Sequence, residues 1–233
     1  MTFNSVSFFA FFPLAVLVCW LVPRRWQNAA LLAVSYAFYC FNTPAWLPVL
    51  VLDSLATWAL VRRMDAAEGL SRKRRLWAAL GVNLGLLVLL KGASLLLHGA
   101  AVSAGLWQAL SRLGLASEAG GSAFSVILPL GISFFTLQAI GCAVDVYREK
   151  CPVPQSAVHF CLFTSFFGFI SSGPITRAGS FLPQLQAPRR FDADKAVSGL
   201  VLMAQGLLAK VCVADLLAVI ANGVWSDVRA YSG

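Results

Sequence analysis

Several polar and charged side chains stand within or beside long apolar segments of this chain. Gln138 lies deep in a stretch, residues 124–144, that contains no charged residue, and Lys210 lies near the centre of another apolar segment. An amide without a partner costs several kcal/mol in hydrocarbon, and a lysine at the centre of a spanning helix costs about 2.5–3.5 kcal/mol. Both residues therefore predict either contacts between helices or a polar cavity within a membrane.

Two interpretations of Gln138 stay open. Its amide can form an interhelical hydrogen bond that only holds a bundle together, a contact worth about 0.6–2 kcal/mol, or it can line a cavity. Pro129 and Gly131 interrupt the same stretch, and irregular backbone at membrane depth is tolerated where it is buried in protein or faces water. The segment is thus a candidate wall of a reaction or transport path.

Three further candidates lie near the ends of apolar segments. Asp145 and Arg148 are three residues apart, a spacing that predicts a local ion pair at a helix end, with substrate contact as the alternative. Arg177 follows Gly173 and Pro174, and its planar guanidinium suits a phosphate or a carboxylate. The competing interpretation of Arg177 is an ordinary basic flank of a membrane segment.

Lys210 and Asp215 share the last apolar segment. Their spacing corresponds to about 140° around a regular helix, so the two side chains are not expected to pair directly. Lys210 then needs a distant partner, a water-filled funnel or a break in the helix.

The histidines and cysteines give no catalytic or metal pattern. His98 ends one apolar run and His159 begins another, so each is interpreted as an interfacial side chain. The six cysteines form no Cys-x-x-Cys pair and have no histidine spacing suited to zinc, which predicts no metal site and no bound cofactor.

The composition is that of an integral membrane protein. Hydrophobic residues make up 59% of the 233 residues and charged residues 12%, against roughly 25% charged in soluble domains, and the mean hydropathy is +0.76. The net charge of +8 comes from basic residues at the ends of apolar segments, a pattern that argues against nucleic-acid binding. Spans are predicted near residues 5–22, 27–42, 45–61, 76–97, 124–146, 156–175 and 197–221.

The distribution of basic residues predicts an orientation. Residues 62–75 contain six arginines and lysines and are placed in the cytoplasm by the positive-inside rule. Segment 156–175 is expected to re-enter the membrane without crossing it, because it ends in small and helix-breaking residues. Residues 101–121 are expected to form an interfacial helix or a loop, and residues 1–233 a single membrane domain.

Several blocks of sequence resemble the membrane-bound O-acyltransferases, in particular the bacterial branch that contains the alginate O-acetyltransferase membrane subunit. The resemblance extends along the chain in the same order as in that family. The blocks that carry it are residues 28–32, 35–39, 129–136 with Gln138, 145–148, 163–177, 183–185 and 206–210 with Ala214 and Asp215.

This resemblance implies an all-α polytopic membrane bundle with broken and re-entrant helices, C-terminally incomplete. The implied reaction is transfer of an acyl group, acetyl in the first instance, from an acyl-CoA donor to a hydroxyl of an exported polysaccharide such as alginate. The family's characteristic histidine is expected beyond Gly233, so no catalytic residue is assigned here, and the chain is expected to be inactive alone. Gln138, Asp145, Arg148, Arg177 and Lys210 would line the donor path.

The expected surroundings are the bilayer of a bacterial inner membrane, crossed several times, with a polysaccharide acceptor and a periplasmic acetyltransferase partner. A polytopic membrane carrier is one alternative, in which Gln138, Asp145 and Lys210 would line a substrate path. A noncatalytic membrane scaffold is the other.

Overall fold

The computed structural model describes residues 5–65, 68–97, 111–114, 116–119, 123–126, 128–171, 173–189 and 191–226. The chain forms two compact units, Met1–Ala187 and Pro188–Gly233, which are described one at a time below. The expectation of one membrane domain over residues 1–233 stays a prediction.

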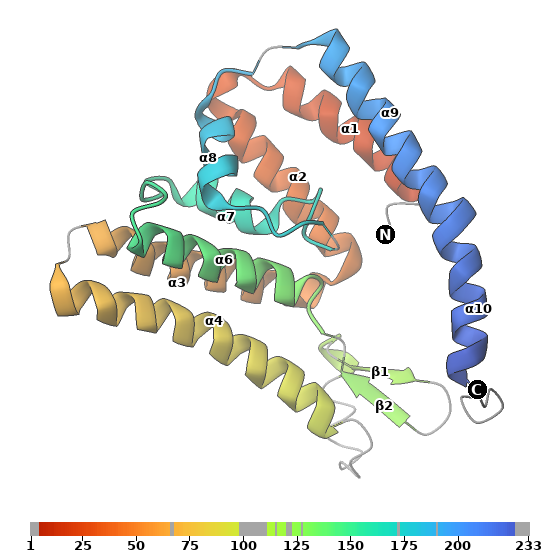
Figure 1. Cartoon of the computed structure of the whole chain (residues 1–233), viewed down its shortest axis with the longest axis horizontal. Coiled ribbons are helices and arrows are strands. Elements are labelled where there is room, and N and C mark those ends of the chain that lie inside the picture. Colours follow the sequence, from red (N-terminus) through yellow and green to blue (C-terminus); the bar gives the residue numbers. More distant parts are fainter. Residues whose placement is uncertain are drawn as a thin grey trace. The chain divides into compact units, whose positions relative to one another are not determined.

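The first unit is a helical bundle with one small hairpin (Figure 1). Helices α3, α4 and α6 lie side by side, and α7 packs on α2 and α3. Its helices are α1 (Val6–Leu21), α2 (Gln27–Asn42), α3 (Leu47–Asp65), α4 (Gly69–Leu97), α6 (Ile132–Tyr147), α7 (Ala157–Ser165) and α8 (Ala178–Gln186). Short 3-10 turns, η1 (Arg24–Trp26) and η2 (Pro44–Trp46), precede α2 and α3.

The prediction of an all-α membrane protein is confirmed. Three helical segments of the described chain are long and apolar enough to cross a bilayer, namely Pro44–Asp65, Gly69–Leu95 and Ala193–Ser226. Helices α1 and α6 are apolar but shorter. Large aliphatic side chains such as Leu52, Val88 and Leu89 lie on the surface of the first unit, as expected where lipid replaces water.

The predicted span 124–146 is wrong in its first third. Strand β1 (Ala116–Ala119) pairs in an antiparallel hairpin with β2 (Ala123–Val126), and α6 begins only at Ile132. Gly131 precedes the helix with a φ of 67°, and a Cβ there would collide with the carbonyl oxygen of Ile170. Only glycine fits this close approach. The remaining helix is about 24 Å long, less than a hydrocarbon core of about 30 Å.

The hairpin also corrects the expectation for residues 101–121, because β1 is neither a helix nor an irregular loop. His98 and residues 101–110 lie outside the described residues. In segment 156–175, α7 ends at Ser165 after about 14 Å, so this helix cannot cross a hydrocarbon core alone. Its re-entry remains a prediction.

The core of the first unit has two apolar clusters. One is aromatic and joins α1, α2 and α6 through Phe8, Phe38 and Phe135, with Phe167 beside them. The other lies where α3, α4, α6, α7 and α8 meet and includes Met64, which is fully buried. These clusters hold in place the ends of helices that carry the charged residues.

The second unit is one long helical segment. It consists of α9 (Ala193–Ala209), a π-helical turn η3 (Lys210–Ala214) and α10 (Asp215–Ser226). Asp192 caps its start, since its carboxylate accepts the backbone N–H of Lys195, and that hydrogen bond lowers the pKa of Asp192.

Candidate functional site

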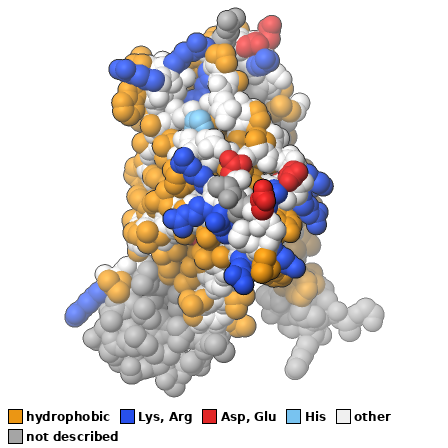
Figure 2. Space-filling view, turned by 90° about the vertical axis from the view of Figure 1, so that its left-hand side faces the viewer, with side chains coloured by type: hydrophobic (Ala, Val, Ile, Leu, Met, Phe, Trp, Pro, Cys, Tyr) orange, Lys and Arg blue, Asp and Glu red, His pale blue; other side chains and the backbone are white. Residues whose placement is uncertain are grey.

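Charged side chains gather at the end of the bundle where α3 and α6 finish and α4 begins. Figure 2 looks onto this end and shows blue and red side chains together, with orange flanks beside them. The basic residues of α3 and α4 at this end are Arg62, Arg63, Arg72, Lys73, Arg74 and Arg75. The end therefore carries the features predicted for the cytoplasmic face.

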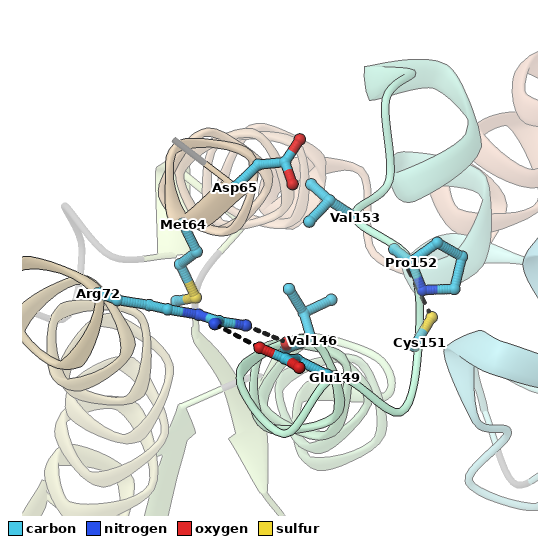
Figure 3. A pocket seen from close by; sticks show the side chains of 8 residues that line it. All are labelled: Met64, Asp65, Arg72, Val146, Glu149, Cys151, Pro152 and Val153. Carbon is cyan, nitrogen blue, oxygen red and sulfur yellow. Dashed lines mark hydrogen bonds and ion pairs between the residues drawn. The ribbon is translucent and has the colours of Figure 1, made fainter. Parts of the chain in front are cut away.

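A cavity of about 500 Å³ opens at this end (Figure 3). Side chains from α3, α4, α6 and the loop after α6 surround it. They are Met64, Asp65, Arg72, Val146, Glu149, Cys151, Pro152 and Val153. A second cavity of about 380 Å³ adjoins it and shares Asp65, Cys151, Pro152 and Val153. Together they form a depression in which the charged residues Asp65, Arg72 and Glu149 line the larger cavity and the walls of the smaller one are mainly apolar.

Arg72 is fixed in the wall of the larger cavity. Its Nη1 donates to Glu149 Oε1 at 2.8 Å, its Nη2 donates to the carbonyl of Val146 at 3.1 Å, and the guanidinium carbon lies 5.7 Å from the Tyr147 ring centre. Glu149 adopts a φ of 59°, an uncommon left-handed conformation for a residue other than glycine. These contacts tie the start of α4 to the end of α6.

Asp145 lies beside Arg177, and the local pair with Arg148 expected from sequence is not formed. The Arg177 Nη1 atom is 4.0 Å from Asp145 Oδ1. The Asp145 side chain is only 16% exposed and contacts the side of the bundle where α8 begins, whereas α6 ends at Tyr147 and Arg148 is exposed beyond it. Tertiary packing thus overrides the favourable spacing within the helix.

Arg177 precedes α8, whose later residues Leu182, Pro183 and Gln186 line the smaller cavity. Arg177 is the N-cap of α8 and is 77% exposed, and a Cβ on Gly179 would touch Cys151 in the cavity wall. Burial raises the pKa of Cys151, and the nearby Asp145 carboxylate raises it further. Two predicted site residues, Asp145 and Arg177, are therefore brought together beside the cavity, with a protonated thiol in its wall.

Gln138 is buried inside the bundle and lines neither cavity. Its side chain is 2% exposed, and its Oε1 atom has no hydrogen-bond partner among the described residues. The interhelical bond that the bundle interpretation requires is not formed through this oxygen. The choice between bundle contact and cavity wall stays open.

Lys210 and Asp215 do pair, contrary to the expectation from a regular helix. Lys210 Nζ lies 2.7 Å from both Oδ1 and Oδ2 of Asp215. The π-helical turn η3 begins at Lys210 and ends just before Asp215, and its i to i+5 repeat places side chains five apart on the same face. In a regular α-helix the two side chains would point in different directions, and the π-helical turn brings the ammonium and the carboxylate together.

Asp53 is a polar residue that the sequence reasoning missed. It lies in α3, is 5% exposed, and neither carboxyl oxygen has a partner among the described residues. The available signal was an acidic residue within the apolar run 45–61, and ionisable residues inside membrane segments are functional candidates by default.

His159 has a structural role in this fold. Its Nε2 lies 2.9 Å from Asn28 Nδ2, and the same amide donates to the carbonyl of Leu185. Among the residues the structure describes, no group of histidine, cysteine or acidic side chains could hold a metal ion. The chemistry of the described part thus rests on cations, carboxylates and cavities.

The sequence is similar to bacterial O-acetylases along almost its whole length. It is 30% identical over 228 residues to the "Probable alginate O-acetylase AlgI" of Azotobacter vinelandii, covering 95% of this chain and 43% of that protein. The chain is a homologue of these O-acetylases. The Pseudomonas aeruginosa protein of the same name is 29% identical, with 95% of this chain and 41% of that protein covered.

A "Peptidoglycan O-acetyltransferase" of Helicobacter pylori also matches, at 27% identity over 91% of this chain and 44% of that protein. The resemblance drawn from the sequence blocks is thereby confirmed. This O-acetylase homologue spans less than half the length of the curated relatives it matches. No family model and no solved structure matches it.

Proposed function

We propose that this chain forms the donor-binding part of a membrane O-acetyltransferase of a bacterial inner membrane. In the proposed reaction an acetyl group passes from acetyl-CoA in the cytoplasm to a hydroxyl of an exported polysaccharide. The observation that carries the proposal is the similarity to named O-acetylases over 95% of the chain. The cationic, cavity-bearing end of the bundle supports it independently.

The donor is a polyanion with a long, flexible thioester arm. Arg177 is the proposed group for its phosphates, because its guanidinium is exposed at the start of the helix that lines the smaller cavity and is only loosely held by Asp145 at 4.0 Å. Arg72 is already engaged by Glu149 and the Val146 carbonyl, so its proposed role is to shape the cavity wall. The narrow arm would enter the adjoining cavities, the smaller of which has largely apolar walls.

The remaining components of the reaction follow from its chemistry. Transfer to a hydroxyl needs a general base with a pKa near neutral, and His159 is held by Asn28, so the base is not assigned to a described residue. We propose a histidine beyond Gly233, in line with the family resemblance, and a periplasmic acetyltransferase as a partner that hands the group onward.

The test is reconstitution of the full-length gene product in proteoliposomes. With acetyl-CoA labelled in its acetyl group, label is expected to reach an added polysaccharide in a protein-dependent manner. An Azotobacter vinelandii relative serves as the positive control. If the relative transfers label and this protein neither transfers it nor releases free acetate from the donor, the proposal is wrong.

A further inference from the structure

Three buried side chains on helices α3, α4 and α6 carry oxygens without hydrogen-bond partners among the described residues. They are Asp53 in α3 (5% exposed), Asn83 in α4 (0%) and Gln138 in α6 (2%). The unpartnered atoms are both carboxyl oxygens of Asp53, Oδ1 of Asn83 and Oε1 of Gln138. We call these four atoms the buried oxygen layer.

The three residues lie at a common level of the bundle. Met64 in α3, Arg72 in α4 and Val146 in α6 line one cavity and mark a common level. Moving from the cavity into the bundle, residue numbers fall along α3 and α6 and rise along α4. Asp53 is eleven residues from Met64 and Asn83 is eleven from Arg72, about 16 Å along each helix, and Gln138 is eight from Val146, about 12 Å. The levels agree within about one helical turn.

Asp53 and Asn83 also lie on the sides of α3 and α4 that carry the cavity residues, and Gln138 lies one turn from Cys142 on α6. An eleven-residue spacing returns to nearly the same side of a helix, so Asp53 and Asn83 share the sides of Met64 and Arg72. Between the cavity and the layer, α3, α4 and α6 contribute Val61, Ala79 and Cys142 to one apolar cluster. The layer is therefore the next level of the same three-helix junction.

A hydrogen bond joins two of the helices at this level. Asn83 Nδ2 donates to Thr57 Oγ1 at 2.7 Å and to the Ala79 carbonyl at 2.9 Å. A carbonyl can only accept, so this contact fixes the orientation of the amide and leaves Oδ1 as the unpaired atom. Thr57 lies one turn from Asp53, which places the carboxyl group close to the α3–α4 contact.

All four unpartnered atoms are hydrogen-bond acceptors, and together they carry at most one negative charge. Leaving such atoms buried and unpaired destabilises a protein, and native structures pair nearly all of them, with water or an ion where protein groups are lacking. A cation would satisfy these acceptors and balance the Asp53 charge at the same time, and it must be small, because the three residues are almost completely enclosed. Carboxylate and amide oxygens are the ligands that hard cations prefer.

We propose that the buried oxygen layer binds a monovalent metal cation between α3, α4 and α6, with Asp53 as its charged ligand. One carboxylate and one monovalent ion are neutral together, whereas a divalent ion would leave a net charge in the bundle. The inference does not depend on the acyl-transfer proposal, since it rests on contacts inside the first unit.

The experiment measures the thermal unfolding of the purified full chain in detergent, with sodium chloride, potassium chloride or choline chloride at equal ionic strength. Ligand binding to the folded state raises Tm, by roughly 5–10 °C when the ion is about 100-fold above its Kd. Sodium or potassium, but not choline, is expected to raise Tm. Asp53→Asn is expected to remove this response while folding normally in choline.

Two further variants separate binding from structure. Gln138→Met removes a ligand oxygen but fills the same space, and it is expected to weaken the rise of Tm with sodium or potassium. This variant tests the site if Asp53→Asn fails to fold. Asp192→Asn replaces an exposed helix cap by another good cap and is expected to keep the full response. Equal Tm values in all three salts would overturn the proposal, and so would a Tm that responds to pH alone, since the proton would then neutralise Asp53.

Discussion

Arg177, at the start of α8, lies 4.0 Å from Asp145, near the end of α6, and this contact joins two blocks of sequence that each resemble the O-acyltransferases. The distance is longer than a charge-assisted hydrogen bond of about 2.7–2.9 Å. The guanidinium is therefore oriented by the carboxylate but keeps donors available. An exposed cation held in this way can exchange its partner for a phosphate.

Replacing Arg177 by alanine is expected to raise the KM for acetyl-CoA about 10- to 100-fold, since a hydrogen bond to a charged group is worth about 1.5–3 kcal/mol. Arg177→Lys should recover only part of the loss, because an ammonium lacks the planar fork. Steady-state kinetics of the full-length protein provide the measurement. Lys195→Ala, at an 86% exposed lysine of the second unit, is the matched control. An unchanged KM in Arg177→Ala would remove this residue from the donor site.

The thiol of Cys151 is expected to react slowly with iodoacetamide at neutral pH. Burial and the Asp145 carboxylate raise the pKa of Cys151, and the thiolate is the reactive form. Alkylation of Cys151 should therefore begin at a higher pH than alkylation of an exposed cysteine. Asp145→Asn should shift the profile to lower pH. A pH–rate profile of a variant with Cys151 as its single cysteine measures this, and identical profiles with and without Asp145 would contradict the assigned electrostatics.

The pair of Lys210 and Asp215 is expected to be coupled in the membrane. Lys210→Met alone leaves Asp215 uncompensated in a candidate span, with a cost of about 2–3 kcal/mol. Combining Lys210→Met with Asp215→Leu should recover most of the loss. Membrane-integrated yield and Tm of the two single variants and the double variant form the cycle. Additive losses would show that the two residues do not stabilise one another.

The orientation of the first unit is tested at Leu70, which is 64% exposed in the first turn of α4. Leu70→Cys, in a background without other cysteines, is expected to react with a membrane-impermeant maleimide only when the reagent reaches the cytoplasmic face. Labelling of intact spheroplasts from outside would reverse the orientation and move the proposed donor site to the wrong side.

The sequence predicted the helices well where an apolar run was bounded by polar or turn-forming residues. The predicted segments 5–22 and 27–42 correspond to α1 (Val6–Leu21) and α2 (Gln27–Asn42). The start of α6 was misplaced because β2 is as apolar as the helix that follows it, and only the backbone at Gly131 separates them. Hydropathy does not distinguish an apolar strand from the start of a span.

The site was predictable in its residue types but not in its contacts. Arg177 and Asp145 were both candidates, yet the preference for Arg148 as partner followed from spacing along one helix, and the fold brought in α8 instead. Likewise, Lys210 and Asp215 pair only because one turn is π-helical, which composition and spacing do not encode. Asp53 was missed because it is distinguished by carboxyl oxygens that have no hydrogen-bond partner among the described residues, and this depends on the tertiary structure.

Protection of Cys151 from alkylation by acetyl-CoA tests the central claim most directly, because this thiol lies in the walls of both cavities assigned to the donor. In the full-length protein with Cys151 as its single cysteine, acetyl-CoA is expected to slow alkylation in a saturable manner. The concentration for half-protection should be about 10- to 100-fold higher in Arg177→Ala. An alkylation rate that saturating acetyl-CoA leaves unchanged would contradict the account.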